Sequence, residues 1–193
     1  MTFAVYRSLI VLTTAFTSTT RPVMVRAMIL AHEPRQARVA GEAYVRLTLR
    51  AGGIVLIRAI TQEDVHDYII LAQQLGYEVD DNYLLGRIIH STDTEIVYVA
   101  ELEGKVIGWI DCIITSTYLH EPHCEIAGLV VDENTRSKGI VERLVQTAEH
   151  WAKEKGINEI TVRSNVKRER AHKFYIRHGY TIVKQSMIFS KKI

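Results

Sequence analysis

The segment with the clearest capacity for chemistry is a basic, glycine-containing loop that joins an apolar run to an amphipathic stretch. Residues 128–145 read G-L-V-V-D-E-N-T-R-S-K-G-I-V-E-R-L-V, and the apolar spacing after Gly139 predicts a helix. Backbone N–H groups at a helix N-terminus have no intrahelical partner and lie at the positive end of the helix dipole. Gly139 lets a phosphate approach the backbone closely, while Arg136 and Lys138 add positive charge. The sequence therefore predicts a site for a phosphate-bearing ligand.

Histidines and cysteines gather in one short stretch, but their spacing does not favour a metal site. His120, His123 and Cys124 lie in H-E-P-H-C, which matches no common structural zinc pattern. Cys112 and Cys124 both lie in apolar runs, unlike a disulfide framework or a partnered nucleophilic thiol. We therefore expect no metal, no covalent enzyme intermediate on cysteine, and a reducing, cytoplasmic setting.

The elements that would position the loop alternate along the chain, with Thr61 as a helix cap and Glu103-Gly104 as a hairpin turn. Strands are expected at residues 54–59, 96–101, 106–115, 123–131, 157–163 and 180–189, and helices at residues 61–75, 82–90, 139–155 and 167–178. The predicted fold class is α/β of the α+β type. It has a mixed, mostly antiparallel sheet with helices on both faces.

Length and charge narrow the classes of function. The 193 residues, 47% of them apolar, can bury a core, most simply as one domain. A formal net charge of +2 does not favour nucleic-acid binding through bulk electrostatics. The longest apolar run is far shorter than the about 20 residues that span a bilayer, so no membrane association is expected.

A change of composition near Gly52-Gly53 divides the chain. Residues 1–53 contain seven arginines, no lysine and only two acids, whereas lysine is frequent in residues 54–193. Three interpretations of residues 1–53 stay open: an organelle transit peptide, a weak secretion signal, or a poorly ordered extension that follows from a start site assigned too early. We expect the functional domain to comprise residues 54–193.

Three motifs together closely resemble the GNAT (Gcn5-related N-acetyltransferase) family. They are the loop motif described above, R-S-N-V at residues 163–166, and H-K-F-Y-I-R-H-G-Y at residues 172–180. The resemblance covers residues 54–193, and the expected order of elements agrees with the GNAT fold. It implies an N-acetyltransferase that uses acetyl-CoA as co-substrate.

The resemblance also implies a role for each residue that matches a motif. The backbone of one strand would bind the pantetheine arm, and the loop and first helical turn would wrap the pyrophosphate. Asn165 would hydrogen-bond the cofactor, and Tyr175 would contact it and protonate the departing thiolate. A core position is the other interpretation of Tyr175. The implied cofactor-binding residues are Leu129, Val130, Val131, Arg136, Ser137, Lys138, Gly139, Ile140, Val141, Glu142, Asn165 and Tyr175.

Val141 departs from the family pattern, which has glycine or alanine at this position of the loop. A β-branched side chain adds bulk close to where the phosphates would dock. We therefore expect weakened CoA binding, and Val141→Gly to tighten it.

Transfer to an amine also needs a proton acceptor, because a free amine is mostly protonated at neutral pH. Glu125 is the candidate general base, acting directly or through water; a solvated or salt-bridged strand residue is the other interpretation. The acceptor would be a small-molecule or protein amine attacked directly in a ternary complex, and a homodimer is left open. The alternatives are an acyl-CoA-binding sensor or partner-binding module with little turnover, and a nucleotide-binding domain of another kind.

Overall fold

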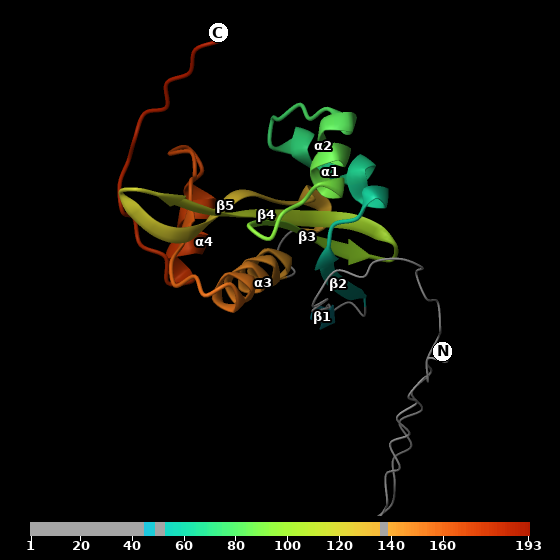
Figure 1. Cartoon of the computed structure of the whole chain (residues 1–193). Coiled ribbons are helices and arrows are strands. Elements are labelled where there is room, and N and C mark those ends of the chain that lie inside the picture. Colours follow the sequence, from blue (N-terminus) through green and yellow to red (C-terminus); the bar gives the residue numbers. More distant parts are fainter. Residues whose placement is uncertain (1–44, 49–52, 136–138) are drawn as a thin grey trace, which may run out of the picture. The chain divides into compact units, whose positions relative to one another are not determined.

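The computed structural model describes residues 45–48, 53–135 and 139–193, and the side chains from residue 53 onward. All of these residues belong to the compact unit formed by Val39–Ile193. Within them, a sheet carries helices on both faces (Figure 1).

The sheet has six strands in the order β1-β2-β3-β4-β5-β6, which is also their order along the chain. Each strand pairs antiparallel with the next, except that β5 and β6 are parallel. The expected mixed, mostly antiparallel sheet is therefore confirmed. The strands are β1 (Val45–Thr48), β2 (Ile54–Ala59), β3 (Glu95–Leu102), β4 (Lys105–Thr117), β5 (His120–Val131) and β6 (Ile160–Val162).

Two apolar clusters lie on opposite faces of the sheet. On one face, α1 (Val65–Gln74) and α2 (Asp81–Ile89) follow the short 3-10 turn η1 (Gln62–Asp64) and pack on side chains such as Val99 and Trp109. On the other face, the long helix α3 (Ile140–Glu154) buries its apolar side against residues such as Ile110. The turn η2 (Glu133–Thr135) precedes α3, and α4 (Glu169–Arg177) follows β6.

The hairpin between β3 and β4 turns where the sequence predicted it. Glu103 and Gly104 have φ angles of 52° and 80°. Two successive residues with positive φ make the turn whose twist matches that of a hairpin, and glycine adopts such angles without steric penalty.

The expected last strand at residues 180–189 is wrong. Residues 180–193 form no strand and pair with none of the described strands, and side chains such as Val183 and Ile188 are 81% and 85% exposed. The segment is rich in branched and aromatic residues, which strands favour, but strand formation depends on a neighbouring strand to pair with. The strand expected at residues 157–163 is also shorter, because β6 comprises only Ile160–Val162.

The sheet begins before the composition boundary at Gly52-Gly53. β1 pairs with β2 in the register Val45↔Ile57 to Thr48↔Ile54. Residues 45–48 thus contribute a strand although they lie in the segment assigned to the extension. The boundary between extension and domain stays a prediction.

Candidate active site

The parallel strands β5 and β6 pair over three residues, up to the end of β6. Cys124, Glu125 and Ile126 pair with β6, but β5 continues to Val131. A bulge in the register between Asp111 and Cys112 of β4 lies at the same level, and bulges bend a strand and increase its twist. Beyond Ile126, β6 therefore no longer pairs with β5, and we call this side of β5, beside Leu129 and Val130, the β5–β6 inlet.

The predicted pantetheine-binding residues border this inlet. Leu129 and Val130 pair on one side with Ile110 and Trp109 of β4, and Val131 pairs with Gly108. The register of β6 ends at Ile126, so β6 does not cover Leu129 and Val130 on their other side. An extended ligand could bind along β5 there as an added strand does.

The N-terminus of α3 begins at a glycine in the left-handed conformation. Gly139, at the cap, has a φ angle of 78°, and its carbonyl accepts a hydrogen bond from the Arg143 N–H at 3.1 Å. A Cβ atom built on Gly139 would meet no heavy atom within 4 Å, so the space in front of this backbone is open. Arg136, Ser137 and Lys138, predicted for the same site, lie outside the described residues.

The three residues that follow Gly139 point in different directions. Ile140 is 2% exposed in the core, and Val141 is half-buried against the same core cluster. Glu142 is exposed and accepts a hydrogen bond from Gln146 Nε2 at 3.3 Å. Contacts of Ile140 with a phosphate would therefore use its backbone. Much of the bulk of Val141 is taken up by core packing.

Asn165 shapes the turn between β6 and α4. Its Oδ1 accepts a hydrogen bond from the Lys167 N–H, and its carbonyl accepts one from the Arg168 N–H, each at 2.9 Å. A ligand contact would therefore use the side-chain NH2 group. The neighbouring Ser164 has a buried Oγ with no hydrogen-bond partner. Because buried hydroxyls normally have partners, this orphaned atom at the end of β6 fits a place where a ligand supplies one.

Tyr175 belongs to a group of aromatic side chains on and after α4. Its ring makes edge contacts with Phe174 and Tyr180, with centroid distances of 5.4 and 5.3 Å. The Tyr180 hydroxyl donates to Glu149 Oε1 of α3 at 3.0 Å, which ties α4 to α3. Burial raises the pKa of Tyr175 to about 12, so its phenol is protonated at neutral pH and can donate a proton.

Glu125 lies on the face of the sheet that α1 and α2 cover. Its Oε2 accepts a hydrogen bond from Arg163 Nη2 at 2.9 Å, and its side chain is 13% exposed against 78% for Arg163. The ion pair is consistent with a structural role for Glu125. It is also compatible with a catalytic role, because the exposed side chain of Arg163 can move aside.

Asp111 is a carboxylate that sequence reasoning missed. It is the acid in the apolar run W-I-D-C-I-I, on the same face as Trp109 and opposite Gly128 on β5. Burial is the largest cause that raises its pKa to about 6, and the nearby Glu95 raises it further while Arg87 lowers it. In the sequence, an acidic residue inside an apolar run was the feature that could have pointed to Asp111. The role of this residue could not be inferred without knowing which strands lie beside it.

The described residues hold no group of three or more His, Cys, Asp or Glu side chains placed to bind a metal ion. Nor do they include a helix with the length and apolar character needed to cross a membrane. The cytoplasmic setting stays a prediction.

Comparison with known proteins identifies the class. The model described as the Acetyltransferase (GNAT) family matches residues 57–180, and the chain belongs to this family. The aminoalkylphosphonate N-acetyltransferase of Salmonella typhimurium is 31% identical over 129 residues, which are 64% of this chain and 83% of that protein. An uncharacterized N-acetyltransferase of Bacillus subtilis is 36% identical over 72 residues, 37% of this chain and 49% of that protein.

Solved structures share the fold. An aminoglycoside N-acetyltransferase in complex with CoA has a TM-score of 0.65 at 19% identity, over 74% of this chain and 97% of that one. A ribosomal-protein-alanine N-acetyltransferase from Brucella melitensis has a TM-score of 0.60 at 16% identity, over 71% and 99%. The protein is thus an acetyl-CoA-dependent N-acetyltransferase, with acetyl-CoA as its co-substrate. This excludes the reading as a nucleotide-binding domain of another kind.

Proposed function

We propose that this enzyme acetylates a primary amine of a small, cationic molecule by direct attack on acetyl-CoA in a ternary complex. The observation that carries the acceptor class is the placement of Asp111 and Glu125 on one face of the sheet, beside the β5–β6 inlet. Two carboxylates there attract an ammonium group. The names of the aminoalkylphosphonate relative and the aminoglycoside neighbours, which denote small amines, add support.

Glu125 takes the proton of the bound ammonium group, directly or through a water molecule, and Asp111 supplies the second negative charge that holds this group. The free amine then attacks the thioester carbonyl. The N–C bond forms as the C–S bond breaks, Tyr175 donates its proton to the departing thiolate, and the nitrogen of the new amide loses its extra proton to water. A backbone N–H near Leu129 or Val130 stabilises the negative charge that develops on the carbonyl oxygen.

Three parts of the chain would each bind a different part of acetyl-CoA. The backbone of Leu129, Val130 and Val131 binds the pantetheine arm, and the α3 N-terminus from Arg136 to Glu142 binds the pyrophosphate. The NH2 group of Asn165 and the hydroxyl of Ser164 bind where β6 leaves β5.

The test is release of CoA thiol from acetyl-CoA in the presence of separate amine classes. The panel comprises aminoalkylphosphonates, aminoglycosides, polyamines and peptides with free termini. We expect release with at least one small-molecule class, and its loss in Glu125→Gln with binding of CoA retained. Release with peptides alone would show that the acceptor is a protein and not a small molecule. Binding of acetyl-CoA without release across the panel would favour the alternative of an acyl-CoA sensor.

A further inference from the structure

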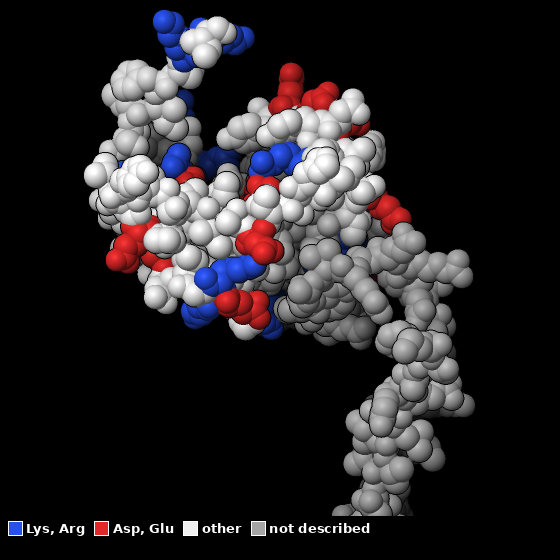
Figure 2. All heavy atoms as spheres, viewed as in Figure 1, with Lys and Arg blue, Asp and Glu red and all other residues white. Residues whose placement is uncertain are grey.

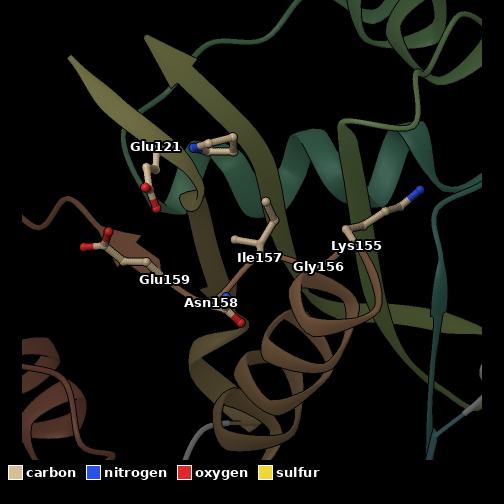
Figure 3. A pocket seen from close by; sticks show the side chains of 7 residues that line it. Glu121, Lys155, Gly156, Ile157, Asn158 and Glu159 are labelled. Carbon is tan, nitrogen blue, oxygen red and sulfur yellow. The ribbon is translucent and has the colours of Figure 1, made fainter. Parts of the chain in front are cut away.

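The short strand β6 is anchored at its start. The Cys124 N–H of β5 donates to the Glu159 carbonyl at 2.9 Å, and Ile157 is 8% exposed in the core. Figure 3 shows Ile157 and Asn158 between the end of α3 and β6. The hollow of about 320 Å³ in this view lies at the opposite end of β6 from Asn165. The position of Asn165 therefore depends on contacts made after the strand ends, in the turn to α4.

A histidine of α4 reaches back to that turn. His172 is half-buried, and its Nε2 lies 3.0 Å from the carbonyl oxygen of Asn165. Because a carbonyl oxygen only accepts hydrogen bonds, Nε2 carries a proton and is the donor. The Arg168 N–H donates to the same oxygen at 2.9 Å. The two donors together use both lone pairs of the Asn165 carbonyl and hold it in place.

The ring of His172 supplies a link that an ordinary helix cap does not supply here. Within the part of the chain that the structure describes, the side chain of Arg168, the N-cap of α4, makes no capping hydrogen bond. The His172 backbone N–H closes the first helical turn at the Arg168 carbonyl, 3.1 Å away. Without the imidazole, Asn165 would be bonded only by the Lys167 and Arg168 N–H groups, which belong to the turn itself.

The orientation of Asn165 matters because charge alone does not hold an anionic ligand on this protein. Lys and Arg side chains are mixed with Asp and Glu among the described residues of the face shown in Figure 2, and the formal net charge is only +2. Binding then depends on individual donors. The Asn165 Oδ1 already accepts from the Lys167 N–H, so the NH2 group is the donor left for a ligand. A misdirected NH2 group would lose its bond, because hydrogen bonds weaken steeply away from their preferred angle.

We propose that His172 is a positioning residue for acetyl-CoA. Its ring holds the Asn165 carbonyl and thereby directs the Asn165 NH2 group and the adjacent Ser164 hydroxyl toward the co-substrate. His172 itself neither touches the co-substrate nor transfers a proton. The inference rests on the function proposed above, in which Asn165 binds acetyl-CoA, and adds a residue that acts on this binding through Asn165.

Calorimetric titration with CoA measures the effect. His172→Phe keeps an aromatic ring but removes the donor, and the Kd for CoA should rise about three- to tenfold, the effect of one hydrogen bond. His172→Gln returns an N–H donor close to the position of Nε2 and should bring the Kd to within about twofold of the wild type. An unchanged Kd in His172→Phe, or no recovery in His172→Gln, would overturn the proposal.

His178→Phe is the matched control. This histidine lies at the other end of α4 and packs its ring on Phe174, with a centroid distance of 4.2 Å. The Kd for CoA should therefore be the same as in the wild type. A rise as large as that in His172→Phe would mean that any change of ring on α4 weakens binding, and the specific role of His172 would be wrong.

A double-mutant cycle separates this inference from the function on which it rests. If Asn165 binds the co-substrate, Asn165→Ala alone raises the Kd, and adding His172→Phe should raise it by less than about twofold more. Additive effects would show that His172 does not act through Asn165, and would overturn the inference while the role of Asn165 stands. An unchanged Kd in Asn165→Ala would remove Asn165 from the site and overturn both.

The tautomer of His172 gives a test that needs no ligand and no variant. Long-range 1H–15N spectra of the neutral imidazole should show its proton on Nε2, and a proton on Nδ1 would overturn the proposal. In steady-state assays, His172→Phe should raise the KM for acetyl-CoA with kcat and the KM for the amine nearly unchanged, because the lost contact binds substrate and transition state equally. A lower kcat with an unchanged KM for acetyl-CoA would contradict a positioning role.

Discussion

The contact between Gly128 of β5 and Trp109 of β4 gives a prediction whose size can be worked out from the structure. A Cβ atom at Gly128 would lie 2.7 Å from Trp109 Cζ3 and 3.0 Å from Cη2, closer than carbon atoms approach without a shift. Trp109 is 4% exposed, is stacked on Tyr68 with a centroid distance of 4.2 Å, and donates from Nε1 to the Tyr68 carbonyl at 3.3 Å. The indole therefore has little room to move.

We expect Gly128→Ala to lower the free energy of unfolding. Overpacking of a core costs about 1–3 kcal/mol. Replacing glycine by alanine restricts the unfolded chain and offsets about 0.4–1 kcal/mol of this. The net loss should be about 0.5–2 kcal/mol. Since Asp111 Cβ lies 3.9 Å from the added atom, kcat/KM for the amine should also fall.

Urea unfolding followed by tryptophan fluorescence measures the change, with Gly86→Ala as the matched control. Gly86 lies inside α2, and a Cβ atom there meets nothing within 4 Å. Alanine in a helix interior is more favourable than glycine by about 0.5–1 kcal/mol, so this variant should be more stable than the wild type. If Gly128→Ala were as stable as the wild type, the argument that Tyr68 immobilises Trp109 would be refuted.

Four further predictions concern the site. Tyr175→Phe should lower kcat by about 10²-fold with little change in CoA affinity by calorimetry, and full activity would remove Tyr175 as the acid. Asp111, whose pKa burial raises to about 6 in the folded state, favours the folded state most when protonated. Its contribution to stability should therefore be lost as pH rises from about 4 to 6, and Asp111→Asn should abolish this loss in urea titrations. Arg163→Ala should remove the hydrogen bond that Glu125 accepts and raise kcat/KM for the amine; an unchanged kcat/KM would argue against Glu125 as the base. Val141→Gly should tighten CoA binding while lowering the unfolding free energy, because the valine packs on the core; unchanged CoA affinity would show that the valine is accommodated.

Local patterns predicted most of the elements because their signals are short-range. The turn at Glu103 and Gly104 needed only a residue pair able to adopt positive φ between two apolar runs. Helix α3 was expected at residues 139–155 and spans Ile140–Glu154, since its apolar side repeats with the helical period. Residues 180–189 have the branched and aromatic composition of a strand, yet form no strand. Pairing depends on where an open edge lies, and periodicity contains no such information.

The sequence by itself determined the family, the loop that leads into α3, and the positions of Asn165 and Tyr175, because each depends on residue types at fixed spacings. Only the tertiary structure decided that β6 pairs with β5 no further than Ile126, that Asp111 shares a face with Glu125, and that the last segment is not paired with the sheet. These facts follow from register, bulges and the burial of one strand beside another. Such relations arise between residues far apart in the chain, where spacing along the sequence says nothing about distance in space.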